Sequence, residues 1–191
     1  MEQNQTTALI TLENTEKRNQ TISLSTLQRS EVGAADYVSH LSAGDVKLLA
    51  LIAGKKKLHG DRNSLLIKTI FDGALRISEA LALRPCDVEQ TTGGWLVHIL
   101  GKGAGGKPGT AAITATTAAE LQAYCYRHKI DETSLIFNLS RSQSFRVIQA
   151  AYEKAGIRQP CQVRDHVGCL HVLRHSGAIA RLQVSGNPKS V

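Results

Sequence analysis

The sequence has 191 residues, 42% of them hydrophobic and 20% charged, a composition typical of one soluble globular domain with a tail. Its net charge of +7 favours an anionic partner, most often nucleic acid, while an aromatic content of 4% argues against a surface that stacks single-stranded bases. No apolar run approaches the roughly 20 residues that cross a bilayer. Because Met1–Thr7 is polar and the four cysteines have no CxxC spacing, we expect a cytoplasmic protein with reduced thiols.

Residues 1–41 are rich in Gln, Asn, Thr and Ser, which predicts a polar, mobile N-terminal extension. Ser42 and Asp45 then form a capping-box pattern, so we expect an ordered domain over residues 42–191 that begins with a helix ending at Gly54. Three consecutive lysines follow in a basic turn: Lys55, Lys56 and Lys57.

The next segment, residues 62–71, has almost no polar face, which predicts a helix buried at the centre of the domain. A further helical stretch covers Ser78–Leu83. Gly94–Leu100 alternates as a strand does, and Thr110–Ile113 is expected to return beside it. The glycine-rich residues between them, Gly101–Gly109, predict a turn or loop.

The C-terminal half of the domain is expected to be mainly helical. A helix capped by Thr117 and Glu120 is expected to end at Lys129, before a short extended piece at Leu135–Phe137. The remaining expected elements are a helix over Ser142–Ala155, an irregular segment over Arg158–Gly168 and a last helix from His171 to about Val184. Together these elements predict an α+β fold, mainly α, with one small sheet.

Arg76 stands in the stretch ALRISEALAL, at the end of the most apolar part of the chain. A buried guanidinium is costly unless it is paired, and Glu79 lies three residues on, where it is able to orient the arginine. The pattern fits a structural Arg–Glu pair. It also fits an arginine aimed at a phosphate, because the planar guanidinium binds two phosphate oxygens at once.

Two further patterns carry cations. Lys102 and Lys107 flank a glycine-rich turn, which taken alone fits a solvated hairpin tip and is no Walker loop, since Pro108 follows Lys107. In HVLRHS, helical spacing places His171, Arg174 and His175 on one face, apart from the apolar residues. That face fits either solvent or an anion that relieves the repulsion between the cations.

Taken together and in this order, the three patterns resemble the tyrosine recombinases, or phage-integrase family. The matching motifs are Arg76 in LRISE, Lys102 in GKG, and the run HVLRH, and the resemblance covers roughly residues 42–191. It implies a helical catalytic domain with a small antiparallel sheet, the DNA breaking-rejoining enzyme fold. It also implies double-stranded DNA as partner, assembly as a homo-oligomer on DNA, and neither a cofactor nor a small-molecule substrate.

The reaction that the resemblance implies is site-specific recombination or integration through a 3′-phosphotyrosine. In that reaction Arg76 and Arg174 clamp the scissile phosphate, His171 supports the clamp, and Lys102 is the general acid, although Lys107 remains an alternative. The supporting and DNA-binding residues would be Glu79, His175, Lys55, Lys56, Lys57 and Lys107.

The family's nucleophilic tyrosine has no counterpart here. The four tyrosines, Tyr37, Tyr124, Tyr126 and Tyr152, all precede HVLRH, so we expect a chain cut off before the nucleophile and unable to cleave DNA. One alternative is therefore a non-catalytic DNA-binding or regulatory relative. A less favoured alternative is a zinc module built from Cys161, His166, Cys169 and His171, whose spacing matches no standard zinc site.

Overall fold

The computed structural model describes residues 40–100, 108–157 and 169–185. The expected N-terminal extension, most of the glycine-rich loop and the segment over Arg158–Gly168 lie outside these ranges, apart from a few boundary residues. Within them the chain is mainly helical with one three-stranded antiparallel sheet, so the predicted fold class is confirmed. None of the helices in the described part is long and apolar enough to cross a membrane.

The first described helix, α2 (Ala43–Gly54), begins at the predicted capping box. The amide of Asp45 donates to Ser42 Oγ at 3.1 Å, and the amide of Ser42 donates to the Asp45 carboxylate at 2.9 Å. These reciprocal bonds satisfy backbone donors that the start of a helix leaves unpaired. The predicted capping box at Ser42 and Asp45 is therefore confirmed.

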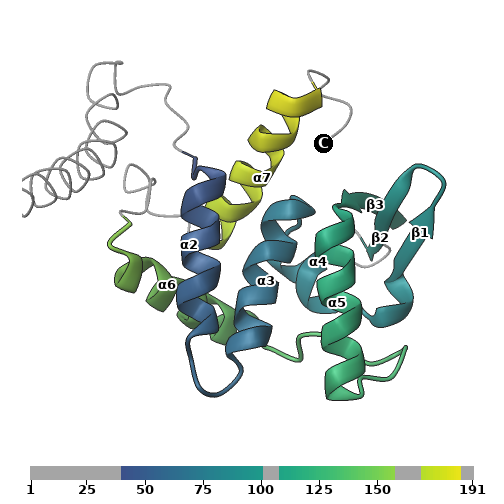
Figure 1. Ribbon diagram of the computed structural model, residues 1–191, viewed down its shortest axis with the longest axis horizontal. Helices are drawn as coiled ribbons and strands as arrows, with labels where there is room; N and C mark the ends of the chain where they lie inside the picture. The colour runs from purple at the N-terminus through teal and green to yellow at the C-terminus, as the bar shows by residue number, and fades with distance from the viewer. Residues whose placement is uncertain (1–39, 101–107, 158–168, 186–191) are drawn as a thin grey trace, which may run out of the picture. The chain divides into compact units, whose positions relative to one another are not determined.

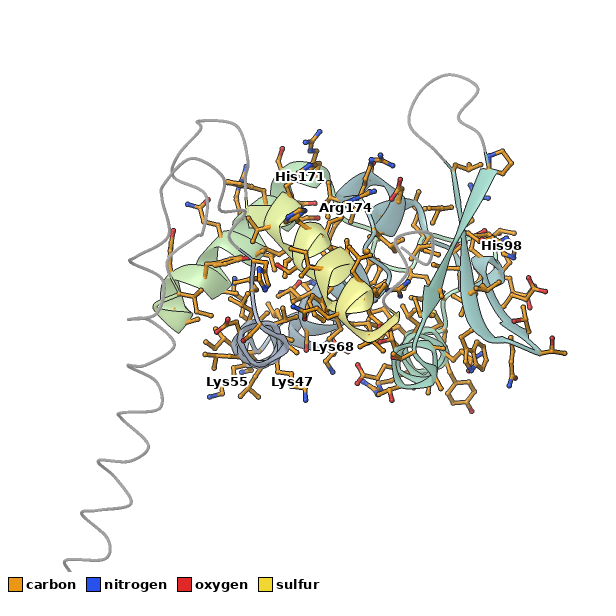
Figure 2. The ribbon with its side chains drawn as sticks, turned by 90° about the horizontal axis from the view of Figure 1, so that it is seen from above. Lys47, Lys55, Lys68, His98, His171 and Arg174 are labelled. Carbon is orange, nitrogen blue, oxygen red and sulfur yellow. The ribbon has the colours of Figure 1, made fainter. Side chains whose placement is uncertain are left out.

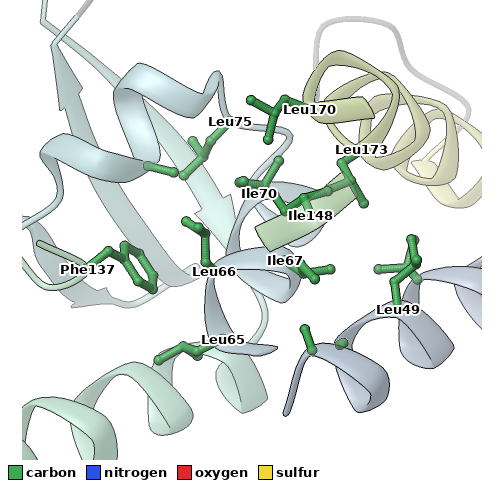
Figure 3. Packing of buried hydrophobic residues seen from close by; sticks show 14 of the residues in the cluster. Leu49, Leu65, Leu66, Ile67, Ile70, Leu75, Phe137, Ile148, Leu170 and Leu173 are labelled. Carbon is green, nitrogen blue, oxygen red and sulfur yellow. The ribbon is translucent and has the colours of Figure 1, made fainter. Parts of the chain in front are cut away.

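Helix α3 (Gly60–Asp72) is the central element, as its sequence predicts. It packs against α2, α5 and α7, and Figure 1 shows it lying between α2 and α5. Figure 3 shows its apolar side chains facing Leu49 of α2 and Leu173 of α7 on one side and Phe137 on another. Leu66, Ile67 and Ile70 are fully buried, and the side chain of Lys68 between them remains 40% exposed, so α3 is buried over most of these turns.

The small sheet follows α4 (Ile77–Ala82) and a short 3-10 turn, η1 (Pro85–Asp87). Its strands, in the order β1-β2-β3, are β1 (Val88–Thr91), β2 (Gly94–Leu100) and β3 (Pro108–Ile113). Strands β2 and β3 were predicted, whereas β1 and η1 were not. The expected loop was too long at its end, because Gly109 pairs with Ile99 in the sheet.

The predicted cap of α5 (Ala115–His128) was wrong. Thr114 is the N-cap, and its Oγ1 accepts the amide of Thr117 at 3.3 Å, so Thr117 lies inside the first turn. Glu120 does not cap the helix. Instead, both of its carboxylate oxygens accept hydrogen bonds from Lys68 Nζ, at 2.8 and 2.7 Å. Thr114 occupies the cap because Asp72, at the end of α3, accepts both its amide and its hydroxyl, a tertiary contact that no local pattern reveals.

The last two helices are α6 (Arg141–Ala155) and α7 (Cys169–Ser185), close to the predicted ranges. Gly156 ends α6 with a φ of 63°, a left-handed conformation that glycine adopts without strain. Residues 135–137 form no strand. Instead the amide of Ile136 donates to the carbonyl of Leu83 at 2.9 Å, and the side chains of Ile136 and Phe137 fill the core.

Helices α3 and α7 cross in backbone contact at Gly177. A Cβ built on Gly177 would lie 1.9 Å from the carbonyl oxygen of Phe71, so no larger residue fits without moving α7. We expect Gly177→Ala to lower the free energy of unfolding by about 2–3 kcal/mol, as overpacking against backbone does. Urea unfolding followed by circular dichroism measures this. Gly44→Ala, where the new Cβ meets only Ser42 Oγ at 3.5 Å, is the matched control and should be neutral or stabilising.

Candidate phosphate-binding site

Arg76 is held at the first residue of the turn that opens α4. Its backbone is extended, with φ −67° and ψ 149°, and its amide donates to Glu79 Oε2 at 2.6 Å. The guanidinium Nη1 donates to the other carboxylate oxygen, Oε1, at 2.7 Å. Arg76 is 48% exposed while Glu79 is only 4% exposed, so the buried carboxylate orients a guanidinium that still faces solvent. The predicted Arg–Glu pair is confirmed.

Glu79 also binds the second arginine of the predicted clamp. Arg174 Nη1 donates to Glu79 Oε2 at 3.3 Å, across 95 residues of sequence. Arg76 and Arg174 therefore meet at the two oxygens of one carboxylate, although one lies just before α4 and the other on α7. The two arginines thus converge on the Glu79 carboxylate, while their binding of one common phosphate stays a prediction.

The charges at this point do not balance. Two guanidiniums share one buried carboxylate, which leaves one surplus positive charge on side chains that are 48% and 31% exposed. Burial lowers the pKa of Arg174, and the positive charge of Arg76 lowers it further, against the opposing effect of Glu79. An anion bound on the open side would relieve the repulsion between the arginines, and a phosphate oxygen pair matches two guanidinium forks.

Helix α7 presents the HVLRHS residues on two different faces. His171 is exposed and Arg174 is partly exposed, whereas Val172 and Leu173 are buried. Figure 2 shows His171 and Arg174 together on the same side of the ribbon. Ser176 anchors the opposite face, because its buried hydroxyl donates to the carbonyl of Val172 at 2.7 Å and accepts the amide of Leu41 at 2.8 Å.

His175 lies next to the clamp arginine in sequence and is partly buried. Its Nε2 is inaccessible to solvent and has no hydrogen-bond partner among the described residues. No interaction of this ring with Arg76, Glu79 or Arg174 is observed, so its supporting role stays a prediction.

The predicted lysines are not brought to the clamp by the described structure. Lys102 and Lys107 lie outside the described residues, in the segment that joins the paired ends Leu100 and Pro108. The exposed Lys55–Lys57 run comes before α3, and Arg76 comes after α3. A helix of 13 residues spans about 20 Å, so the lysines and Arg76 lie toward opposite ends of α3. In Figure 2, Lys55 lies on the opposite side of the ribbon from His171 and Arg174.

No metal site is found in the part of the chain that the structure describes, where no group of three or more His, Cys, Asp or Glu residues is placed to hold an ion. Cys161 and His166 of the alternative zinc module, and the side chain of Cys169, lie outside the description. The described tyrosines, Tyr124, Tyr126 and Tyr152, lie on α5 and α6, whereas Arg76 lies just before α4 and Arg174 lies on α7.

One cation on α7, Arg181, was not among the predicted site residues. The Arg181 guanidinium donates through Nη2 to two backbone carbonyls, those of Asp72 and Ala112. Neither partner is a side chain, so no pairing of opposite charges in the sequence indicated it. The only available signal was a lone arginine seven residues after Arg174, which places both on one helix face.

Comparison with solved structures identifies the fold. The chain superposes on the XerH site-specific recombinase bound to difH substrate with a TM-score of 0.60 and 24% identity, covering 78% of this chain and 44% of that one. XerA recombinase gives 0.61 and 20%, covering 84% and 55%, so the chain spans about half the length of these two proteins. The catalytic domain of bacteriophage HP1 integrase gives 0.57 and 18%, covering 79% and 76%.

No protein-family profile and no curated protein sequence matches the chain. The structural likenesses are all below 25% identity and therefore establish the fold. They agree with the resemblance that Arg76, Lys102 and HVLRH indicated from sequence. The chain has the catalytic-domain fold of the tyrosine recombinases.

Proposed function

We propose that this chain binds double-stranded DNA and supplies the phosphate clamp of a site-specific recombinase. The observation that carries the proposal is the meeting of Arg76 and Arg174 at the buried carboxylate of Glu79. A structural ion pair needs one arginine, whereas two arginines on one carboxylate leave positive charge directed to solvent. In a fold shared with recombinases, a scissile phosphate is the anion that this arrangement suits.

The proposed reaction is a transesterification. A tyrosine hydroxyl gives up its proton to His171 or to water as its oxygen attacks phosphorus, the bond between phosphorus and the tyrosine oxygen forms, and the bond to the 5′-oxygen breaks. Arg76 and Arg174 stabilise the charge on the non-bridging oxygens, with Glu79 holding both and His171 supporting them. Lys102, or Lys107 in the same loop, donates the proton that the leaving 5′-oxygen takes up.

The attacking tyrosine is proposed to lie outside the four in this sequence. Tyr152 is 1% exposed on α6 and Tyr124 is 8% exposed on α5, where its ring lies 4.3 Å from that of His128. Tyr126 is 90% exposed but also lies on α5, which contributes nothing to the clamp. We therefore assign charge stabilisation to Arg76 and Arg174 and positioning to Glu79, and we assign the nucleophile to none of these tyrosines.

The solved relatives support DNA as the partner. XerH is described bound to its difH substrate, and the Tn1549 transposon integrase is described in complex with circular intermediate DNA. For this chain we propose double-stranded DNA by analogy of fold, a homo-oligomeric assembly on that DNA, and a cytoplasmic location. The net charge of +7 agrees with an anionic partner.

Duplex binding tests the proposal. We expect the 191-residue chain to bind a labelled duplex in fluorescence anisotropy, with an affinity that falls as salt rises, by about 0.9 log units per log unit of salt for each phosphate neutralised. Arg174→Gln should weaken binding about tenfold, because it removes a charge-assisted contact to phosphate. Arg146→Gln, an exposed arginine on α6, is the control for loss of one charge and should change affinity less than about twofold. Binding that ignores salt would contradict the proposal.

A further inference from the structure

Helix α2 has apolar side chains on its outer face as well as on the face that enters the core. Val46, Leu49 and Ala53 are buried, where α2 packs against α3 and α6. On the opposite face Leu48 is 40% exposed and Leu51 is 58% exposed. These two leucines are three residues apart, so their side chains are neighbours on the helix surface. A surface helix ordinarily carries polar residues on this face, whereas α2 presents an apolar strip to solvent.

Two lysines frame the exposed leucines. Lys47, Leu51 and Lys55 follow one another at intervals of four residues, along one line of the helix surface. Leu51 therefore lies about 6 Å along the helix axis from each lysine, and the lysines lie about 12 Å from each other. Both lysines are exposed, and neither forms an ion pair with any residue in the described part of the chain. We call Lys47, Leu48, Leu51 and Lys55 the α2 surface.

A cavity of about 320 Å³ opens beside the α2 surface, among residues of α2, α3 and α5. Its lining is mostly apolar and includes Val46 and Phe71, and Lys47 forms part of its wall. Lys68 also lines the cavity, but its charge is balanced by Glu120 at 2.7 Å. The cavity is large enough to receive a leucine or phenylalanine side chain, and an anchor of that kind in a pocket is what a specific interface needs.

The charges of the α2 surface decide which partner fits it. A second copy of this chain in antiparallel, two-fold contact would place Lys47 of each copy opposite Lys55 of the other, and like charges repel. Duplex DNA takes up cations but gains little from exposed leucines. A lipid surface requires a broader apolar face than two leucines provide. An acidic, amphipathic helix matches both features, because its apolar side chains cover the leucines while its carboxylates pair with the lysines.

We propose that the α2 surface is a docking site for an acidic amphipathic helix of a partner protein. The docked helix carries Leu or Phe at its centre and Asp or Glu seven or eight residues apart, since about two helical turns match the spacing of Lys47 and Lys55. Figure 2 shows these two lysines on the opposite side of the ribbon from His171 and Arg174. Docking therefore uses no residue of the arginine clamp, and it goes beyond the proposed binding of DNA.

Peptide selection tests the chemistry of the partner. A phage-displayed library of random peptides of about 16 residues, a little over four helical turns, is selected on the 191-residue chain. The double variant Lys47→Gln/Leu51→Gln serves as the counter-target. We expect peptides that bind only the wild type to combine Leu or Phe with Asp or Glu at the stated spacing. Enrichment of basic or uncharged peptides would overturn the proposal, as would the absence of any peptide that discriminates between the two targets.

Fluorescence anisotropy of a selected, labelled peptide then tests each residue. We expect Leu51→Gln to weaken binding about tenfold, and Lys47→Gln and Lys55→Gln to weaken it about threefold each. The matched controls are Leu135→Gln, a leucine 44% exposed outside α2, and Lys154→Gln, an exposed lysine on α6, and each should change affinity less than about twofold. All five side chains are exposed, so the variants should keep the wild-type circular dichroism spectrum. Losses no larger than those of the controls would overturn the proposal.

Three further measurements distinguish the other partners. Excess duplex DNA should leave the peptide's affinity within about twofold, and Leu51→Gln should bind duplex as the wild type does. Displacement of the peptide by duplex would assign the α2 surface to DNA and overturn the proposal. Binding to vesicles that contain phosphatidylserine, if Leu51→Gln abolishes it, would assign the surface to lipid. Self-association in sedimentation that the same variant abolishes would assign it to a second copy, and either result would equally overturn the proposal.

Discussion

Glu79→Gln is expected to destabilise the domain by about 3 kcal/mol, because it leaves two guanidiniums facing each other across a site that has lost its negative charge. The wild-type carboxylate is 4% exposed and accepts three hydrogen bonds. Their donors are the backbone amide of Arg76, Arg76 Nη1 and Arg174 Nη1. A glutamine keeps the shape but has one acceptor oxygen for three donors. Urea unfolding at neutral pH measures the loss.

The matched control is Glu120→Gln. Glu120 also binds a cation, Lys68 at 2.7 Å, but both side chains are about two-fifths exposed, at 38% and 40%. Solvent screens such a pair, so the control should cost less than about 1 kcal/mol. Adding sulfate should restore stability to Glu79→Gln more than to wild type, since an anion then takes the place of the carboxylate. Equal costs for the two substitutions would contradict the assignment of Glu79 as the centre of the clamp.

Residues 1–191 alone are expected to form no covalent adduct with a nicked suicide duplex. The clamp stabilises a transition state that a nucleophile must first enter, and the described tyrosines lie on α5 and α6. In a longer protein that carries these residues and a tyrosine after α7, we expect a 3′-phosphotyrosyl adduct that resists SDS. Arg174→Ala in that protein should slow adduct formation by about 10²–10³, the cost of losing one preorganised charge.

Denaturing gel electrophoresis with labelled DNA reads out both results. An adduct formed by residues 1–191 would contradict the expectation, and its tyrosine would be found by replacing Tyr37, Tyr124, Tyr126 and Tyr152 in turn with Phe. Duplex binding without any adduct in a longer protein would instead favour the non-catalytic DNA-binding alternative.

The fold was predictable wherever one element's own side chains decide its structure. Helix α3 carries the apolar run Leu65–Ile67 with Ile70 and Phe71, and a helix with so many apolar residues is expected to be buried in a mainly helical domain. Ser42 and Asp45 cap α2 through contacts three residues apart, and Gly156 ends α6 through its own backbone freedom. In each case the cause lies within a few residues of its effect.

The errors share the opposite property. Thr114, not Thr117, caps α5 because Asp72 holds it from 42 residues away. Residues 135–137 resemble a strand in composition but are satisfied by a single bond to Leu83 and by core packing. Tertiary contacts decided these features, and local patterns carry no information about them.

The clamp was predictable in part. Arg76 and Glu79 are three residues apart and their pairing followed from spacing. The resemblance to a family implied that Arg76 and Arg174 share one phosphate, but not that Arg174 contacts the Glu79 carboxylate. Arg181 was not predictable from either source, because its partners are backbone carbonyls that every residue possesses.

The salt dependence of duplex binding tests the central claim most directly, because it counts phosphates. The slope of log affinity against log salt is measured by anisotropy for wild type, Arg76→Gln, Arg174→Gln and the double variant. If the two arginines clamp one phosphate, the slope should become shallower by the same amount, about 0.9, in each single variant and in the double variant. If they contact separate phosphates, the double variant should lose about 1.8, which would contradict a shared clamp centred on Glu79.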